Sequence, residues 1–283
     1  MLGSILNILL ALGCCFIASG IRRAESRFNE TVASGMSSLM AVAMTSLIIP
    51  ATLYASMERS DAYSDENILV LSHGTAIIML ITYCVYLFFQ LKTHSYLFDA
   101  GVQQETEDDE EELQALEPVG ATVCIVAVVI LIAVCAKYLV DGIDGIAGTA
   151  HISKTFIGLV LLPILGNAAE HATACVAAYR GKMDLAVSVP ISSAMQVVLF
   201  VTPFLVLLGW IIGLPMTLHF QSFETIVLFL SVLVVNSLIQ GGKSNLLEGC
   251  MCLGTYTIIA LAFYVYPDHA GDIGSMFNSV SGG

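Results

Sequence analysis

Long apolar runs, interrupted by short polar stretches, occupy almost the whole chain. A helix needs about 20 mainly apolar residues to cross a bilayer. We expect eight such helices, at Leu2–Ser19, Ala33–Ala55, Asn67–Leu91, Val119–Val140, Thr155–Tyr179, Leu185–Gly213, Phe223–Ile239 and Leu246–Tyr266. The pattern therefore predicts an all-α, polytopic helical membrane protein.

Composition supports this class. Of 283 residues, 57% are hydrophobic and 12% are charged, about half the charged share of a soluble domain. The eight cysteines show no metal-binding spacing, so we interpret them as small packing residues. Much of the net charge of -13 is local, because eight of the 23 acidic residues lie between Glu105 and Glu117.

Short motifs recur in the same order in two parts of the chain. The four pairs are Gly3–Asn7 with Ser192–Gln196, Phe28–Thr31 with Phe223–Thr225, Ser46–Ile48 with Ser237–Ile239, and Gly74–Ile78 with Gly254–Ile258. Each match is weak alone, but four in one order, spread over three helices in each part, indicate an internal repeat.

The repeat predicts how the chain is organised. Residues 119–266 carry five expected helices, whereas residues 1–91 carry three. Two copies of an odd-numbered repeat must be inverted in the membrane, as in many secondary transporters. We therefore expect an inverted five-helix repeat antiporter fold whose first repeat is incomplete, in a chain that lacks its N-terminal helices. Residues 92–118 would form an acidic linker or helix, and 267–283 a short tail.

Basic residues predict the orientation. If the helices alternate in direction, one side of the membrane carries seven Lys and Arg residues and the other carries three. The first set is Arg22, Arg23, Arg27, Lys92, Arg180, Lys182 and Lys243, and the second is Arg59, Lys137 and Lys154. Because cytosolic loops accumulate Lys and Arg, we place the first set and the acidic segment in the cytosol, and the C-terminus in the lumen.

One ionisable residue, Glu170, lies in the middle of an apolar run. A charged side chain at this depth costs about 2.5–3.5 kcal/mol, and such residues usually face a cavity with an ion or a partner. Asn167 precedes Glu170 by three residues, so both would lie on one helix face. Their oxygens suit a hard cation such as calcium. The alternative is a structural pair of Glu170 with His171 or Lys137.

Other polar residues have two interpretations. Ser193 and Gln196 share a helix face and belong to the block repeated at Ser4 and Asn7, so they either supply further oxygen ligands or form interhelical hydrogen bonds. Asp141 and Asp144 flank glycines and favour a solvated turn, with cation gathering as the alternative.

The acidic segment is either a disordered linker or a helix near the membrane that attracts cations. Its candidate cation-gathering residues are Glu107, Asp108, Asp109, Glu110, Glu111 and Glu112.

The string Gly166–His171, the following Ala172–Ala174 and the helix with Ser193–Gln196 resemble the second conserved repeat of the vacuolar cation/proton exchanger (CAX) family, especially its fungal calcium/proton antiporters. The resemblance implies two inverted five-helix repeats plus an extra N-terminal helix, and two glutamates that alternately bind calcium or protons. By this resemblance Glu170 is the second-repeat ligand, with Asn167 as its companion, while Ser193 and Gln196 line the site. Glu170 and His171 would couple to protons, and the acidic segment resembles a regulatory element. The first-repeat glutamate motif is not found in this chain.

The expected function is secondary active antiport, in which calcium moves from the cytosol into the vacuole in exchange for protons. The chain would be a multi-pass protein of the vacuolar membrane, without enzymatic activity or a cofactor. Its partners would be calcium ions, protons and membrane lipid, with a homo-oligomer possible and no nucleic acid. The alternatives are an inactive truncated exchanger and an intramembrane metal-dependent hydrolase that uses His171 and Glu170.

Overall fold

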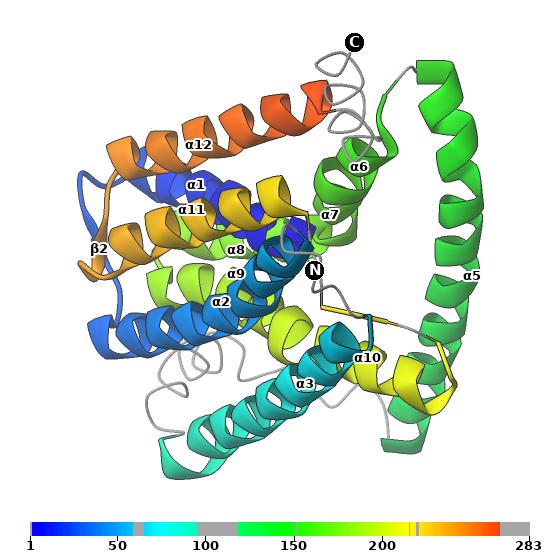
Figure 1. Ribbon diagram of the computed structural model, residues 1–283. Helices are drawn as coiled ribbons and strands as arrows, with labels where there is room; N and C mark the ends of the chain where they lie inside the picture. Colours follow the sequence, from blue (N-terminus) through cyan, green and yellow to red (C-terminus); the bar gives the residue numbers. More distant parts are fainter. Residues whose placement is uncertain are drawn as a thin grey trace.

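The computed structural model describes residues 2–58, 65–94, 118–150, 152–214, 216–218 and 221–266, and these are almost entirely helical (Figure 1). The helices are α1 (Leu2–Gly20), α2 (Glu30–Glu58), α3 (Asp65–Phe88), α5 (Pro118–Ala150), α6 (Lys154–Phe156), α7 (Leu162–Gly166), α8 (Ala168–Arg180), α9 (Met183–Gln196), α10 (Thr202–Ile211), α11 (Ser222–Ile239) and α12 (Leu246–Val265). Three π-helical segments continue or join them, η1 (Phe89–Thr93), η2 (Ile157–Leu161) and η3 (Val197–Val201), and two short strands are β1 (Ser26–Arg27) and β2 (Lys243–Ser244).

The predicted all-α membrane fold is confirmed, and each of the eight expected apolar runs lies on helix. In the described part of the chain, six helices are long and apolar enough to cross a membrane. The run from Lys154 to Arg180 is a seventh span only if its two parts, which meet at a bend of 54°, are counted together. The run Phe223–Ile239 is a shorter apolar helix.

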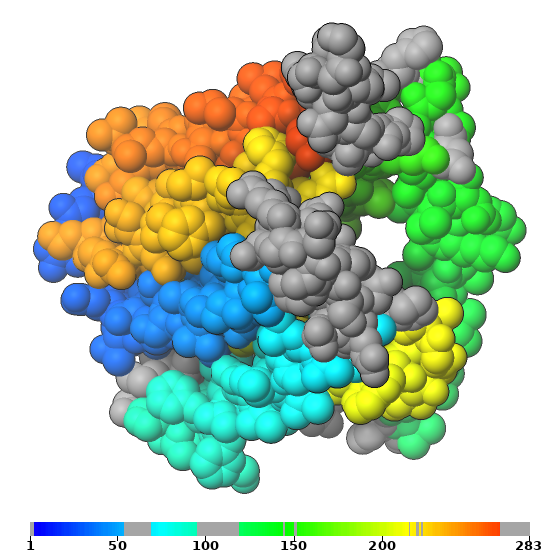
Figure 2. All heavy atoms as spheres, viewed as in Figure 1, coloured from blue at the N-terminus to red at the C-terminus, as the bar shows by residue number. Residues whose placement is uncertain are grey.

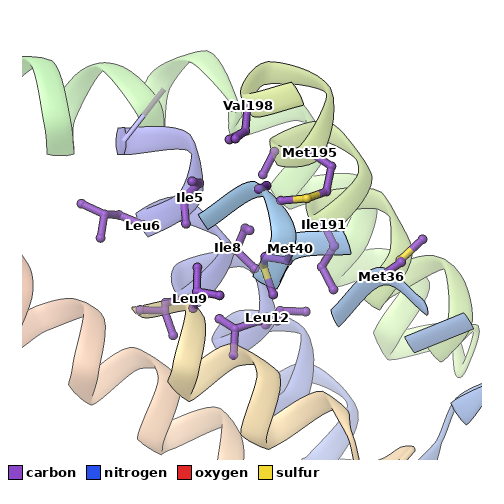
Figure 3. Close-up of a cluster of buried hydrophobic side chains, with 14 of the residues drawn as sticks. Ile5, Leu6, Ile8, Leu9, Leu12, Met36, Met40, Ile191, Met195 and Val198 are labelled. Carbon is purple, nitrogen blue, oxygen red and sulfur yellow. The ribbon is translucent and has the colours of Figure 1, made fainter. Parts of the chain in front are cut away.

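Helix α1 lies at the centre of the bundle. In its apolar span, 67% of the residues are buried inside the bundle, whereas 0% of the residues in the apolar span of α5 are buried. Buried side chains of α1 such as Ile5, Ile8 and Leu12 meet Met40 of α2 and Ile191 of α9 (Figure 3). Most of the core that supports the candidate site therefore surrounds this first helix.

Glycines allow α1 and α12 to pack with their backbones in near contact. A Cβ atom on Gly249 of α12 would lie 2.8 Å from the backbone nitrogen of Ile17 and 3.0 Å from the carbonyl oxygen of Gly13. A Cβ atom on Gly20 of α1 would lie 3.0 Å from the backbone of Leu246. Small residues at such contacts are typical of helix pairs in membranes.

The packing partners agree with an inverted repeat. The motif matches pair α1 with α9–α10, α2 with α11, and α3 with α12. In the structure α1 packs against α12 while α10 packs against α3, and the matched helices α2 and α11 pack against each other, as do α1 and α9. Exchanging the two sets of helices therefore turns the α1–α12 contact into the α10–α3 contact and leaves the α2–α11 and α1–α9 contacts unchanged, as a two-fold relation requires.

The solvated turn expected at Asp141 and Asp144 is not formed, because α5 continues as unbroken helix to Ala150. Its apolar span of 31 residues is about 46 Å long, which exceeds the roughly 30 Å of a hydrocarbon core. A glycine inside a helix costs only about 1 kcal/mol relative to alanine, so Gly142 and Gly145 do not end it. Helix α5 stands apart from the other helices, on the right of Figure 1, and packs against α6.

Three connecting loops meet at one end of the bundle. Nη1 of Arg22 donates to the carbonyl oxygen of Tyr179 at 3.3 Å, and the backbone N–H of Asn29 donates to Oδ1 of Asp184 at 2.5 Å. Strand β1, between α1 and α2, pairs antiparallel with β2, between α11 and α12. We call this end the basic end, because it holds six basic residues: Arg22, Arg23, Arg27, Arg180, Lys182 and Lys243. Helix α3 also ends on this side, and Lys92 follows it in the chain.

An exposed ion pair links two of these loops at the basic end. Nζ of Lys243 lies 3.0 Å from Oε1 of Glu25, and Nε of Arg27 lies 3.6 Å from the same oxygen. The neighbouring Lys243, with a smaller contribution from Arg27, holds the pKa of the Glu25 carboxyl below its usual range. This carboxylate therefore stays charged at neutral pH, although the energy of such an exposed pair is small.

Candidate cation site at a broken helix

The helix that carries the Gly166–His171 motif is broken inside the motif. Residue Asn167 has φ -104° and ψ 14°, outside the helical region, and separates α7 from α8. The backbone N–H of Asn167 still donates to the carbonyl oxygen of Pro163 at 3.0 Å, and Pro163 has no N–H of its own to continue the helix. The side chain of Asn167 does not cap α8, which leaves its amide oxygen for other partners.

Glu170 lies in the first turn of α8, next to this break. Its Oε1 atom accepts a hydrogen bond of 3.0 Å from the hydroxyl of Ser193 on α9. A helix N-terminus carries partial positive charge, which favours a carboxylate or another anion at this position. Local structure and the α8–α9 contact therefore both orient the Glu170 carboxylate.

Glu170 faces a small cavity of about 10 Å³, which is room for roughly one water-sized particle. The cavity is lined by residues of α1, α8 and α9 and by the break itself: Ser4, Asn7, Ile8, Asn167, Glu170, His171, Pro190, Ser193 and Ala194. Four of the residues predicted from the motif, Asn167, Glu170, His171 and Ser193, thus meet in one place. The cavity lies between α1 and the helices α8 and α9, which the expected division of the chain assigns to the first and the second repeat.

Helix α1 contributes Asn7, which is 3% exposed. Its Nδ2 donates to the carbonyl oxygen of Pro163 at 3.1 Å, whereas its buried Oδ1 has no hydrogen-bond partner. A buried acceptor without a partner costs roughly 1–3 kcal/mol. This oxygen in the cavity wall is therefore suited to a cation or a water molecule. In the sequence, only the match of Gly3–Asn7 with Ser192–Gln196 indicates that Asn7 belongs to the site.

No ion pair between Glu170 and a basic side chain is found among the described residues, which leaves the structural alternative without support. Lys137 is exposed on α5, and no residue in the apolar span of α5 is buried. His171 lines the cavity but follows Glu170 directly, and adjacent side chains of a helix do not face each other.

Of the predicted residues that the structure describes, Gln196 is not brought into this cavity. Gln196 is the last residue of α9; its side chain is exposed and does not line the cavity. The acidic residues Glu107–Glu112 lie outside the described residues, so their proposed roles stay predictions.

The assembled groups match the chemistry of a hard cation. One carboxylate, two side-chain amides and two hydroxyls converge on the cavity, and calcium prefers such oxygen ligands. Soft metals would require thiolates or several imidazoles. In the described residues, no three His, Cys, Asp or Glu side chains lie close enough together to hold a metal ion. The described site thus brings one carboxylate together with neutral oxygens, with the ring of His171 beside them.

Ser193 provides a test of the site geometry. We expect Ser193→Ala to weaken apparent calcium affinity about tenfold, because a hydrogen bond to a charged group contributes about 1.5 kcal/mol. Titration of the purified protein with calcium as the probe measures this change. Thr173→Ala is the matched control, since the Thr173 hydroxyl only bonds to the carbonyl oxygen of Ala169 on its own helix. An equal effect of both substitutions would contradict the role of Ser193.

Comparison with known proteins yields relatives over almost the whole chain. The chain is 47% identical over 268 residues to the "Vacuolar calcium ion transporter" of Schizosaccharomyces pombe, covering 94% of this chain and 64% of that protein. It is 41% identical over 275 residues to the "Vacuolar cation/proton exchanger 2" of Oryza sativa subsp. japonica, covering 95% of this chain and 62% of that protein. The chain thus spans a little less than two thirds of the length of these relatives.

A solved structure with the same fold is that of native YfkE, with a TM-score of 0.75 and 29% identity, covering 94% of this chain and 73% of that one. The resemblance to vacuolar cation/proton exchangers is confirmed by these relatives. The model of the family described as "Sodium/calcium exchanger protein" matches residues 1–92 and 120–265. The chain therefore belongs to the sodium/calcium exchanger protein family.

Proposed function

We propose that the chain takes part in secondary active exchange of calcium for protons. The observation that carries the proposal is the position of Glu170, a carboxylate in a membrane-spanning helix that faces a small cavity lined by neutral oxygens. The names of the relatives support calcium and protons as the exchanged ions.

The exchange follows from the chemistry of one carboxyl group. When ionised, Glu170 can bind calcium together with the oxygens of Asn167, Ser193 and Asn7; when protonated, it loses the charge that attracts the cation. The site therefore holds either a calcium ion or a proton. The structure of the site thus supports coupling through competition of the two ions for one carboxyl group.

The direction of calcium movement follows from the proposed orientation of the chain in the membrane. Cytosolic loops are rich in Lys and Arg, so the basic end would face the cytosol and the opposite end the vacuolar lumen. Each pH unit of gradient supplies about 1.4 kcal/mol per proton, and each 100 mV about 2.3 kcal/mol per net charge moved. A few protons leaving an acidic lumen could therefore drive calcium into it. The vacuolar location of relatives supports this assignment.

A gradient experiment tests the proposal. The purified chain is reconstituted into vesicles with an acidic interior, and calcium uptake and interior pH are recorded together. We expect calcium uptake that requires the pH gradient and a matching loss of interior protons. A protonophore should collapse both signals. Calcium uptake of unchanged rate without a pH gradient would contradict proton exchange, and no uptake in either condition would contradict transport by this chain.

A further inference from the structure

A lateral groove runs between α2 and α3, remote from the cation site. It encloses about 390 Å³ and is lined mainly by apolar atoms. The lining residues lie on one side of each wall, from Thr31 to Val42 on α2, and from Thr82 to Tyr86 on α3 with Phe89 at the start of η1. Both helices lie on the near face of the molecule, α2 in blue and α3 in cyan (Figure 2). We propose that this groove binds one acyl chain of an anionic phospholipid.

The depth of the groove matches one leaflet. The eleven residue steps from Thr31 to Val42 correspond to about 16 Å along a helix, roughly half of a 30 Å hydrocarbon core. Thr31 follows the first residue of α2, and Phe89 follows the last residue of α3. The groove therefore starts at the basic end of the bundle and finishes near the middle of the membrane.

The mouth of the groove suits an anionic headgroup. Segment η1 continues α3 past Phe89 and carries Lys92, and the ring of His94 stacks on Phe89 at 4.2 Å. The nearest acid on α2, Glu30, turns toward the α11–α12 loop, because its Cβ would lie 3.1 Å from a Cβ on Gly242. The leaflet on a basic, cytosolic end is the anionic one.

The exposure of its walls indicates that the groove is open to lipid. Val42 of α2 and Val85 of α3 are 50% and 62% exposed, although both are apolar and lie on helices long enough to cross a membrane. Among the described residues, only α2, α3 and the start of η1 line the groove, so membrane lipid is its neighbour. This argument does not rest on the exchange activity.

Native mass spectrometry of the full chain, extracted from membranes of defined composition, tests the proposal. The probes are vesicles of phosphatidylcholine with and without phosphatidylserine. We expect one phospholipid to remain bound per chain, with phosphatidylserine enriched over its share in the vesicle. Lys92→Gln should keep the bound lipid and abolish the enrichment.

Substitutions that fill the groove separate this site from general lipid contact. A Cβ on Gly35 would meet no heavy atom within 4 Å, so Gly35→Leu places its side chain in the groove without a clash. We expect about tenfold lower lipid occupancy, equivalent to about 1.4 kcal/mol. Gly74→Leu on α3 is the matched control, since Gly74 is equally open but does not line the groove. Val85→Trp fills the groove from its other wall and serves if Gly35→Leu folds poorly.

Three outcomes would overturn the proposal. Unchanged lipid occupancy in both groove-filling variants would mean that the lipid binds elsewhere. Retention of phosphatidylcholine and phosphatidylserine in the proportion of the vesicle would remove the headgroup assignment. A second copy of the chain bound in place of lipid, and lost in Gly35→Leu, would identify the groove as a protein interface.

Discussion

Glu170→Gln is expected to abolish calcium-dependent proton movement, down to the background of vesicles without protein. Glutamine has nearly the same shape and still accepts the hydrogen bond from Ser193, which is 3.0 Å long in the structure. It has no charge to attract calcium and no proton to exchange at any physiological pH. The substitution therefore removes the coupling while leaving the packing of α8 against α9 intact. Simultaneous recording of calcium uptake and vesicle pH measures the effect.

Glu30→Gln is the control for this substitution. Glu30 is an exposed carboxylate in the first turn of α2 and lies outside the cavity. Its replacement changes the net charge by the same amount, and we expect normal exchange. Proton-coupled calcium uptake that survives in Glu170→Gln would exclude Glu170 as the coupling group, whatever the behaviour of the control.

The second large effect concerns stability. Gly249→Ala is expected to destabilise the protein by about 1–3 kcal/mol, the usual cost of overpacking. The new Cβ would lie 2.8 Å from the backbone nitrogen of Ile17, and a backbone cannot rotate away as a side chain can. Helices α1 and α12 would have to separate, and α1 is the centre of the core. A lower Tm in detergent, followed through the fluorescence of the single tryptophan, measures this change.

Gly254→Ala is the matched control on the same helix. A Cβ on Gly254 would meet no heavy atom within 4 Å, so only the helix propensity changes, by up to about 1 kcal/mol in favour of alanine. The two substitutions are thus expected to shift Tm in opposite directions. Equal shifts would show that the α1–α12 backbones are not in near contact.

The fold could be predicted from the sequence to the extent that burial in lipid determines it. Apolar runs of about 20 residues have few alternatives to helix in a bilayer, so all eight expected runs are helical. The end of α5 could not be predicted, because Asp141 and Gly142 are typical of turns, yet the helix continues through them. Continuing backbone hydrogen bonds outweigh the small local cost of glycine.

The candidate site was predictable in its residue types but not in its geometry. Pro163 and Gly166 are residue types that weaken a helix, whereas the position of the 54° bend, at Asn167 and beside α1, could not be read from the sequence, because α1 is far away in sequence. Gln196 illustrates the limit of helix-face reasoning. Ser4 and Asn7, three residues apart on α1, both line the cavity, whereas Gln196, about one turn beyond Ser193 at the end of α9, has an exposed side chain.

The carbonyl oxygen of Pro163 limits how the broken helix can serve a cation. It accepts one hydrogen bond from the backbone of Asn167 and another from the side chain of Asn7, at 3.0 and 3.1 Å. A carbonyl oxygen has two lone pairs, so both are occupied. This carbonyl is therefore not available to a cation in the cavity, whereas the side chains that line the cavity can rotate and release a bound ion one bond at a time.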